Sequence, residues 1–386
     1  MKITRRCFVF LALPTAATIL AVTAVTPNLA SSHSYLAFVG TYTTKTDSKG
    51  IYAFTFDAAS GKLSGKGLAA QTPDPSWVAI HPNGKFAFAA NEAGKQSTIT
   101  AFSIDAQTAK FTQLNQLPAQ GEDPCHLSFD KTGTYLFAAN YSSGTVAVFP
   151  IQRDGKLGQP TAVVKNAGQA GPNKERQEGP HAHWVEATPN NKFVLVSDLG
   201  LDRVLIYRFD ATKGTLSPND PAAVGLAAGA GPRHVALAPN GKFLYVVSEL
   251  NSTVTAYSFD VSTGASQQIQ VISTLPSGYH GRNDTAEIAV HPTGKWLFAS
   301  NRGGDSIAVF SIDRADGTVQ SAGWFPTGGK EPRHFAIDPS GHFLLAENQN
   351  TNNITVFRID YATGALSHVA GADGIPAPVC LTFLAH

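Results

Sequence analysis

A segment of about fifty residues recurs along most of the chain, and this repeat restricts the possible folds more than any other feature. Each copy reads as a short apolar strand, a turn such as HPNGK or DPSGH, a second apolar strand, a polar loop, and a third strand that ends near Asp. Proline and glycine suit the turn, because proline fixes φ and glycine accepts a positive φ. The copies begin at Pro75, Pro124, Ala182, Pro232, Thr285 and Pro332.

A second turn, read as DGKL, TKGTL, DGTV or TGAL, leads from the third strand to a fourth. Four strands per repeat at this period predict a β-propeller, whereas a helical solenoid needs a helical pattern that the repeats lack. The two ends of the chain complete one another. Residues 34–63 contain the second to fourth strands of a repeat, and PAPVCLTFLAH at the C-terminus contains a first strand. We therefore predict an all-β fold, a seven-bladed β-propeller closed by N- and C-terminal strands in one blade.

Residues 1–30 differ from the repeats and predict a signal peptide. The segment MKITRRCFVFLALPTAATILAVTAV has a basic start and an apolar stretch too short and mild for a stable membrane anchor. Thr4, Arg5, Arg6 and Phe8 resemble a twin-arginine export signal, which carries folded cargo, and an ordinary secretory signal is the alternative. We expect residues 31–386 to form a single propeller domain that is periplasmic or secreted.

The composition argues against several classes of partner. The chain has 29 basic and 28 acidic residues, which nearly cancel, and no basic stripe indicates a nucleic-acid surface. The three cysteines lie far apart at Cys7, Cys125 and Cys380, and none has the spacing of a zinc site. We expect a monomer that binds a small molecule and needs no metal or cofactor.

Two positions in each repeat are predicted to face the same mouth of the propeller channel, because the loop entering the innermost strand and the loop leaving the second strand share one face. The entering pairs are residues 76–77, 125–126, 183–184, 233–234, 286–287, 333–334 and 379–380, and the leaving pairs are 91–92, 140–141, 198–199, 248–249, 301–302 and 348–349. Turn and strand residues are alike between repeats, whereas these pairs vary. Variation on a uniform scaffold is what a single asymmetric site needs.

Some of these residues nevertheless follow a register, and for them we favour a structural role. His126, His234 and His334 share one position. Asparagines recur at the leaving position and are expected to bond loop backbone groups: Asn91, Asn140, Asn301 and Asn348. Four residues break the register and are our candidates for a site: His183, Arg233, Glu249 and Arg302. Arg333 repeats Arg233 and is an intermediate case.

The segments GPRHVALAPNGKFLYVVSELNSTVTAYSFD and SNRGGDSIAVFSID, with FVGTYT near the start, resemble the propeller-type lactonase family. That family includes 6-phosphogluconolactonases and is related to carboxy-muconate lactonizing enzymes. The resemblance implies a lactone substrate and a site of one His, two Arg and one Glu. It places these on His183 in GPHAHW, Arg233, Arg302 and Glu249, with His181 an open alternative for the histidine. We expect further substrate contacts from His181, His126, Arg333 and Glu287.

The chemistry of lactone hydrolysis suits this set of residues. A lactone carbonyl gains negative charge when water attacks it, and the two arginines can hold that oxyanion or an anionic group of the substrate. His183 or Glu249 can act as the general base. A G-x-S-x-G nucleophile motif is absent from the sequence. Because the chain is predicted to be exported, we expect an unphosphorylated lactone rather than a sugar phosphate.

Two other functions remain open from the sequence. A muconate-type cycloisomerase that acts on an unsaturated dicarboxylate also needs a mouth that binds anions. A non-catalytic binding or surface propeller is the second alternative, and it predicts that the mouth residues repeat in every blade. Arg302, which occurs once at its position, and Glu249, which recurs there only as Glu92, argue against it.

Overall fold

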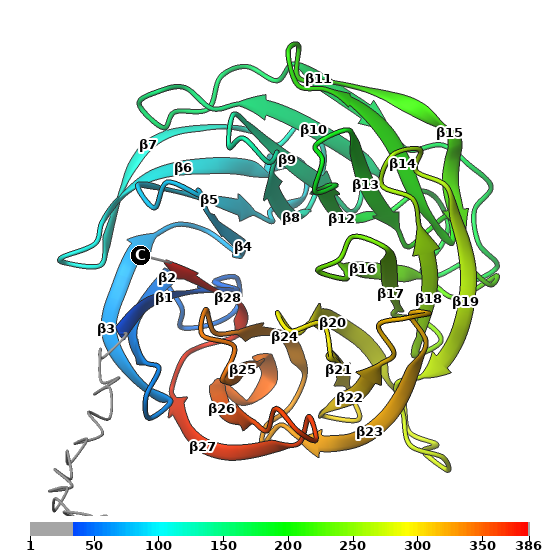
Figure 1. The fold of residues 1–386 in the computed structure, drawn as a ribbon. Helices are drawn as coiled ribbons and strands as arrows, with labels where there is room; N and C mark the ends of the chain where they lie inside the picture. The colour runs from blue at the N-terminus through cyan, green and yellow to red at the C-terminus, as the bar shows by residue number, and fades with distance from the viewer. Residues whose placement is uncertain (1–33, 385–386) are drawn as a thin grey trace, which may run out of the picture. The chain divides into compact units, whose positions relative to one another are not determined.

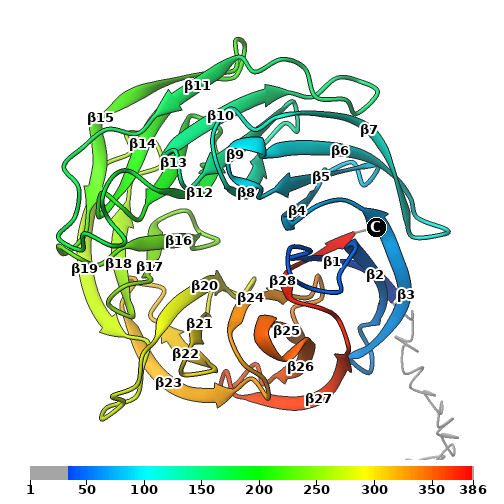
Figure 2. The same cartoon turned by 180° about the vertical axis from the view of Figure 1, so that it is seen from behind.

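The computed structural model describes residues 34–384, which form seven four-stranded antiparallel sheets arranged as the blades of a ring (Figure 1; Figure 2). This confirms the predicted seven-bladed β-propeller. The predicted signal peptide, residues 1–30, lies outside the described residues and stays a prediction. None of the helices between residues 34 and 384 has the length and apolar character to span a bilayer.

In every blade the first strand named lies innermost, at the channel, and the fourth lies outermost. Blade 1 contains β28 (Pro378–Leu384), β1 (Ser34–Thr41), β2 (Gly50–Asp57) and β3 (Lys62–Gln71). Blade 2 contains β4 (Pro75–Ile80), β5 (Phe86–Asn91), β6 (Thr98–Asp105) and β7 (Lys110–Pro118). Blade 3 contains β8 (Pro124–Phe129), β9 (Tyr135–Asn140), β10 (Thr145–Pro150) and β11 (Ala162–Lys165). Blade 4 contains β12 (Ala182–Ala187), β13 (Phe193–Asp198), β14 (Arg203–Asp210) and β15 (Thr215–Gly225).

The remaining blades follow the same order. Blade 5 contains β16 (Pro232–Leu237), β17 (Phe243–Ser248), β18 (Thr253–Phe259) and β19 (Ser266–Ser273). Blade 6 contains β20 (Asp284–Val290), β21 (Trp296–Arg302), β22 (Ser306–Ile312) and β23 (Val319–Pro326). Blade 7 contains β24 (Pro332–Ile337), β25 (Phe343–Asn348), β26 (Asn353–Ile359) and β27 (Leu366–Asp373). Two 3-10 turns, Gly94–Gln96 and Gln349–Thr351, follow β5 and β25.

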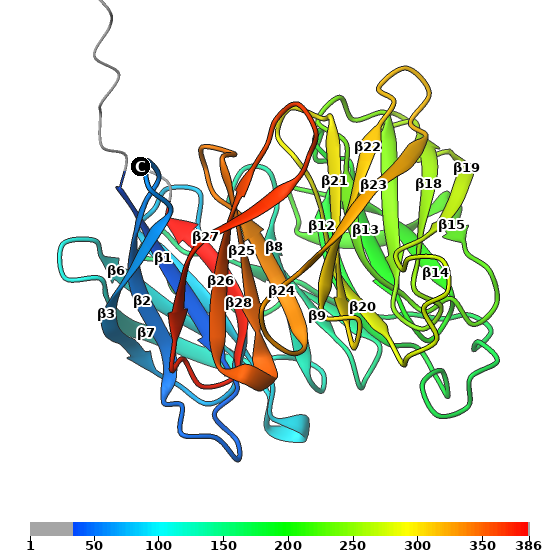
Figure 3. The same ribbon diagram turned by 90° about the horizontal axis from the view of Figure 1, so that it is seen from below.

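Blade 1 closes the ring with strands from both ends of the chain. β1 pairs with β2 on one side and with β28 on the other, in a register that places Leu36 opposite Leu384. The closure that we predicted from the incomplete repeats is therefore confirmed. Viewed from the side, the strands run between the two faces of the ring, so that each face carries one set of connecting loops (Figure 3).

The inner strands share an irregularity that the sequence did not reveal. In blade 5 the register between β16 and β17 shifts between Pro232 and His234, which leaves Arg233 without a partner on β17. The same shift isolates Ser76, Cys125, His183 and Arg333 in four other blades. A bulge of this kind re-aims the side chain of the extra residue. It therefore distinguishes the two residues of each entering pair, which we had expected to face the mouth together.

The blades are held together by apolar side chains at their facing surfaces. Each hydrophobic cluster combines two adjacent blades, as when Phe137 of β9 packs with Val194 of β13. The turn between the third and fourth strands adds a tight contact. At Gly155 and Gly364, which have positive φ, an added Cβ would collide with the rings of Phe86 and Trp296 in the preceding blade. At these two positions glycine is thus favoured by backbone conformation and by packing.

The asparagines at the leaving position perform the structural role that we expected. The side-chain amides donate hydrogen bonds to the backbone carbonyls of the loops that arrive from the preceding blade: Asn91 to Pro73, Asn140 to Ala119, Asn301 to Thr274 and Asn348 to Thr327. These bonds fix the ends of the loops that enter each inner strand. The prediction for this register is confirmed.

Candidate functional site

Three of the predicted site residues meet at one carboxylate on the mouth of the channel. Oε2 of Glu249 lies 3.1 Å from Nε of Arg233 and 2.8 Å from Nη2 of Arg302. All three side chains are buried. Arg233 and Glu249 belong to blade 5 and Arg302 to blade 6, so the cluster bridges two blades.

Backbone contacts explain why these side chains converge. The amide of Glu249, directly after β17, donates to the carbonyl of Gly231, which brings the leaving loop against the entering loop of the same blade. Nη1 of Arg233 donates to the carbonyl of Ala286 at 2.8 Å, and Nε of Arg302 donates to the carbonyl of Asp284 at 3.1 Å. Both arginines are therefore anchored to β20 of blade 6.

Arg176 completes the cluster and was missed by the sequence analysis. Its Nη2 forms an ion pair with Oε1 of Glu249 and lies 3.5 Å from the hydroxyl of Tyr141. Arg176 belongs to residues 166–181, the connection between β11 and β12, whereas residues 226–231 suffice between β15 and β16. The unusual length of this connection, which is rich in charged residues, was the available signal.

Burial and neighbouring charges together set the pKa values of Glu249 and Arg233. Burial raises the pKa of the Glu249 carboxyl, but the attraction of Arg302, Arg233 and Arg176 outweighs it and lowers that pKa to about 2. Burial, followed by repulsion from Arg302, lowers the pKa of Arg233 to about 10. At neutral pH the carboxylate is therefore ionised and the arginine charged. A carboxylate held in this way is a weak base.

His183 lies beside the arginine cluster. Its ring centroid is 5.2 Å from that of His234 and 5.6 Å from that of Tyr141, the residue that contacts Arg176. Its Nδ1 lies 3.8 Å from Sγ of Cys125. Burial lowers the pKa of His183 well below its ordinary value, and the charge of Arg233 lowers it further. The imidazole is therefore neutral at pH 7 and can accept a proton.

His181, the alternative histidine, has a different environment. Its ring stacks on that of Tyr141 with a centroid separation of 4.5 Å, and Nδ1 donates to the carbonyl of Tyr141 at 3.1 Å. Its Nε2 lies 3.1 Å from Oε1 of Glu178. The contacts of His181 are thus with Tyr141 and Glu178, whereas the strongest charge acting on His183 is that of Arg233.

Arg333 lies on the other side of the mouth. Its guanidinium is 5.3 Å from the ring centroid of Tyr42, whose hydroxyl donates to Oε2 of Glu92 at 2.9 Å. Arg333 and Arg233 both line a small cavity of about 10 Å³, together with Glu287. A volume of about 10–15 Å³ accommodates about one water molecule. Arg333 therefore adds positive charge to the mouth without joining the Glu249 cluster.

Glu287 belongs to a chain of polar side-chain contacts that begins at Arg233. Nη1 of Arg233 is 3.3 Å from Nε2 of His234, whose Nδ1 is 3.0 Å from Oε2 of Glu287. The same carboxylate oxygen is 3.5 Å from Nε2 of His334, and Nδ1 of His334 is 2.7 Å from Oε2 of Glu347. Burial raises the pKa of Glu347 well above its ordinary value, and the charge of Glu287 raises it further. Glu287 thus supports Arg233 through His234.

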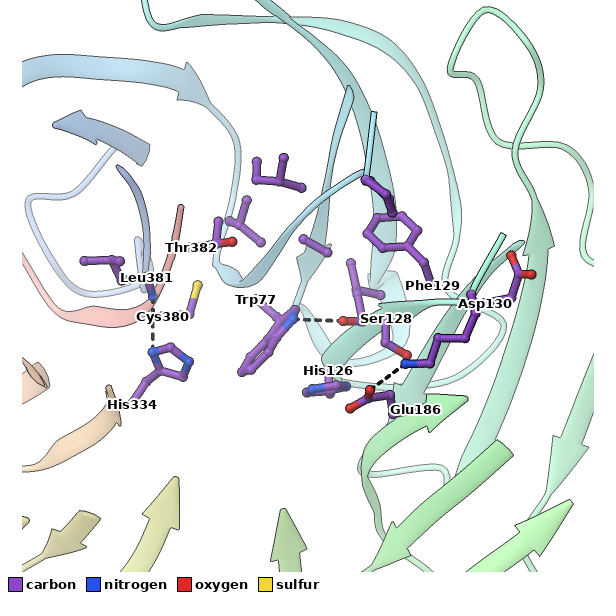
Figure 4. A pocket seen from close by; sticks show the side chains of 16 residues that line it. Trp77, His126, Ser128, Phe129, Asp130, Glu186, His334, Cys380, Leu381 and Thr382 are labelled. Atoms are coloured by element: carbon purple, nitrogen blue, oxygen red, sulfur yellow. Dashed lines mark hydrogen bonds and ion pairs between the residues drawn. The ribbon is translucent and has the colours of Figure 1, made fainter. Parts of the chain in front are cut away.

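The channel has a second cavity. It has a volume of about 420 Å³ and lies between β4, β8 and β28, where Phe129 and Leu381 form part of its wall (Figure 4). The rings of His126 and His334 pack on Trp77 with centroid separations of 4.2 and 5.2 Å. His126, expected to contact substrate, lines this cavity. Trp77 and His334 line both this cavity and the small one beside Arg233.

Within residues 34–384, no group of three or more His, Cys, Asp or Glu side chains is arranged to hold a metal ion. The chemistry available at the mouth is that of guanidinium, imidazole and carboxylate groups.

Comparison with known proteins identifies one family. The family model described as lactonase, 7-bladed beta-propeller, matches residues 36–383. The chain is 37% identical to the 6-phosphogluconolactonase of Bacillus subtilis over 350 residues, which cover 91% of this chain and 98% of that protein. It is 33% identical to a 6-phosphogluconolactonase of Formosa agariphila over 77% of this chain and 85% of that one. The solved structure of the periplasmic gluconolactonase of Pseudomonas aeruginosa superimposes with a TM-score of 0.86 at 31% identity, covering 92% of this chain and 99% of that one.

Proposed function

This chain belongs to the lactonase family of seven-bladed β-propellers, and we propose that it hydrolyses a sugar-type lactone at the mouth formed by His183, Arg233, Glu249 and Arg302. Relatives named 6-phosphogluconolactonase and gluconolactonase support a sugar lactone as the class of substrate. The observation that carries the assignment of the site is the convergence of two buried guanidiniums from adjacent blades on one carboxylate. In contrast with a repetitive binding surface, the bulge residues of the blades differ in type.

The arginines supply the electrostatic part of the proposed mechanism. When water attacks the lactone carbonyl, the carbonyl oxygen becomes negatively charged, and Arg233 and Arg302 stabilise that charge. Their guanidiniums are fixed in advance by Glu249 and by the backbone of β20, so little reorganisation is needed. Glu249 serves to orient the arginines, because its low pKa makes it a weak base.

His183 is the general base of the proposed mechanism. Its neutral imidazole accepts a proton from the attacking water while the water oxygen bonds to the carbonyl carbon. The bond between the carbonyl carbon and the ring oxygen then breaks, and the imidazolium returns the proton to that oxygen. The product is the open-chain hydroxy acid. We assign this role to His183 rather than His181, because His181 is engaged by Tyr141 and Glu178.

The test of the site is hydrolysis of glucono-1,5-lactone by the purified protein, corrected for spontaneous hydrolysis. Replacing Arg233→Ala is expected to lower kcat by about 10²–10³-fold, the usual cost of losing one oxyanion donor. Arg208→Ala, at an exposed position on β14, is the matched control and should retain full activity. Thermal unfolding of both variants shows whether they are folded. Equal rates for the folded Arg233→Ala variant and the wild type would refute the site.

We also propose that the protein acts outside the cytoplasm, because residues 1–30 have the features of an export signal. Replacing both Arg5 and Arg6 by Lys is expected to retain the protein in the cytoplasm if the twin-arginine route is used. Cell fractionation with an antibody checks this. Unchanged export of the double variant would favour the ordinary secretory route, and cytoplasmic wild-type protein would contradict export.

A further inference from the structure

Arg176 is the most exposed member of the arginine cluster. Its side chain is 35% exposed, against 3% for Arg233 and 9% for Arg302. The carboxylate with which it pairs is 4% exposed. The guanidinium of Arg176 is therefore the member of the cluster that lies nearest the solvent, and it pairs with Glu249 from that side.

The backbone that carries Arg176 is firmly attached to blade 4. Nε2 of the buried Gln177 donates to the carbonyl of Leu199 at 2.9 Å and to Oδ1 of Asp202 at 2.7 Å. The amide of Gly171 donates to the carbonyl of Gly200 at 2.8 Å. A movement that breaks the pair with Glu249 is consequently a rotation of the long Arg176 side chain, with the segment 166–181 remaining in place.

The two oxygens of Glu249 have separate partners, and this division allows Arg176 to leave. Oε1 pairs with Arg176, whereas Oε2 pairs with both Arg233 and Arg302. When Arg176 turns away, the carboxylate keeps two cationic partners and the site keeps its geometry. Because Arg176 is partly exposed, water can solvate its guanidinium after it separates from Glu249, which lowers the cost of the separation.

We propose that Arg176 is a specificity-determining residue that exchanges Glu249 for an anionic group of the lactone, a carboxylate or a phosphate, and so selects anionic over neutral lactones. This inference rests on the proposed function. An anionic lactone replaces the lost carboxylate with another one or with a phosphate, both of which match the planar fork of a guanidinium. A neutral lactone has no anionic group to replace Glu249 as the partner of Arg176. It must therefore bind while the Arg176–Glu249 ion pair stays intact.

The experiment compares three lactones that share a six-membered ring. Glucono-1,5-lactone is neutral, its 6-phosphate carries a phosphate, and glucaro-1,5-lactone carries a carboxylate. The wild type is compared with Arg176→Ala and with Lys174→Ala. Lys174 lies exposed on the same segment, and the ion pairs of Glu249 are with Arg176, Arg233 and Arg302, so replacing Lys174 removes one positive charge without breaking any of these pairs.

Arg176→Ala is expected to change the kinetic parameters in opposite directions for anionic and for neutral lactones. For the anionic lactones KM should rise about 10–100-fold, the effect of losing a charge-assisted hydrogen bond. For the neutral lactone kcat/KM should rise up to about fivefold, because the Arg176–Glu249 ion pair is removed. Lys174→Ala should stay within about twofold for all three, as expected for an exposed charge. A preference for the phosphate or for the carboxylate identifies the natural group. An equal loss on all three lactones, or unchanged KM for both anionic ones, would overturn the proposal.

A binding measurement separates this inference from the proposed function. Calorimetric titration with 6-phosphogluconate and with glucarate reports the anion site without catalysis. Binding that weakens tenfold or more in Arg176→Ala and not in Lys174→Ala supports the role of Arg176 even if no lactone is hydrolysed, in which case the proposed function is wrong. Equal binding by wild type and Arg176→Ala, or binding of neither anion by the wild type, contradicts the role of Arg176.

Discussion

At the scale of single residues, the mouth of the channel is organised by Glu249, whose two oxygens hold three guanidiniums. The carboxylate fixes the arginines and remains ionised, while the neutral imidazole of His183 is available as a base. Three positive charges against one carboxylate leave an excess that an oxyanion or a substrate anion can balance. Glu249 thus organises the site, although its lowered pKa makes it a weak base.

Replacing Glu249→Gln tests this organising role. The amide has nearly the same shape but leaves three guanidiniums without their anion, so the variant should lose about 3–5 kcal/mol of unfolding free energy, as expected for a broken buried ion pair. Denaturant titration measures this loss. Glu331→Gln is the control, because Glu331 is partly exposed and lies 4.0 Å from Nη1 of Arg302, and it should cost less than about 1 kcal/mol. Similar losses for the two variants would contradict the central role of Glu249.

The pH dependence of activity tests the role of His183. A histidine whose pKa is lowered stays neutral to a lower pH, so the active form of the base persists below its ordinary pKa. The acidic limb of kcat/KM should accordingly have its midpoint below about pH 6.5, the unperturbed value for histidine. His183→Gln should remove that limb together with most of the activity. An acidic limb centred at or above the unperturbed value in the wild type would argue for a different base.

The sequence identified three members of this cluster and missed the fourth, Arg176. Arg233, Glu249 and Arg302 could be selected because they break a register that repeats in other blades, and a repeat makes such exceptions visible. Arg176 could not be selected in this way, since it lies on a connection that is longer than its counterparts, so that its residues align with none in the other repeats. Its distance from Glu249 depends on how residues 166–181 fold back over the mouth. That path is set by contacts of Gln177 and Gly171 that no pattern in the sequence marks.

At the scale of strands and turns, two devices recur around the ring. The bulge in the inner strands leaves one residue, such as Arg233, without a partner on the second strand, while the next residue, such as His234, stays paired. The glycine turn at the outer edge connects six of the seven blades to the preceding one, as Gly364 does with Trp296, and blade 2 has Ala109 in its place. The turns were predictable, because positive φ favours glycine. The bulges were not, because the extra residue has no characteristic type.

Replacing Gly364→Ala tests the packing of the outer turn. Gly241→Ala is the matched control, because Gly241 has a similar φ of 69° against 71° but no atom within 4 Å of an added Cβ. In both variants alanine must adopt a positive φ, which strains the backbone equally. Only Gly364→Ala adds a clash with the Trp296 ring. We expect it to lose about 1–3 kcal/mol more than the control, the usual cost of overpacking. Thermal and denaturant unfolding measure the difference, and equal losses would show that the contact adds nothing.

At the scale of the whole molecule, the ring depends on one sheet built from both ends of the chain. β28 supplies the inner strand of blade 1, and its side chains pack against β4 on one side and β24 on the other. The sequence predicted this closure, because the incomplete repeats at the two ends add up to one blade. The sequence predicted that the site lies at the mouth of the channel, but not that its arginine cluster joins blades 5 and 6. The cavity lined by Trp77 and His126 was not predicted.

Removing β28 tests this dependence. A chain that ends at Ala377 lacks the inner strand of blade 1 and exposes the edge of β1 together with apolar surfaces of two neighbouring blades. It should lose cooperative unfolding and aggregate, as unpaired edge strands do. A chain that ends at Leu384 keeps β28 and should unfold like the full-length protein. Light scattering and thermal unfolding distinguish them, and a soluble, cooperatively unfolding chain ending at Ala377 would contradict the role of closure.

The closure by β28 also fixes when the fold can be completed. Synthesis proceeds from the N-terminus, so β1 is made long before its partner β28. The intermediate blades can form as they leave the ribosome, but blade 1 must wait until β28 has been made. The ring is therefore completed only once β28 has emerged, and any transport route that accepts folded cargo can engage the protein only then.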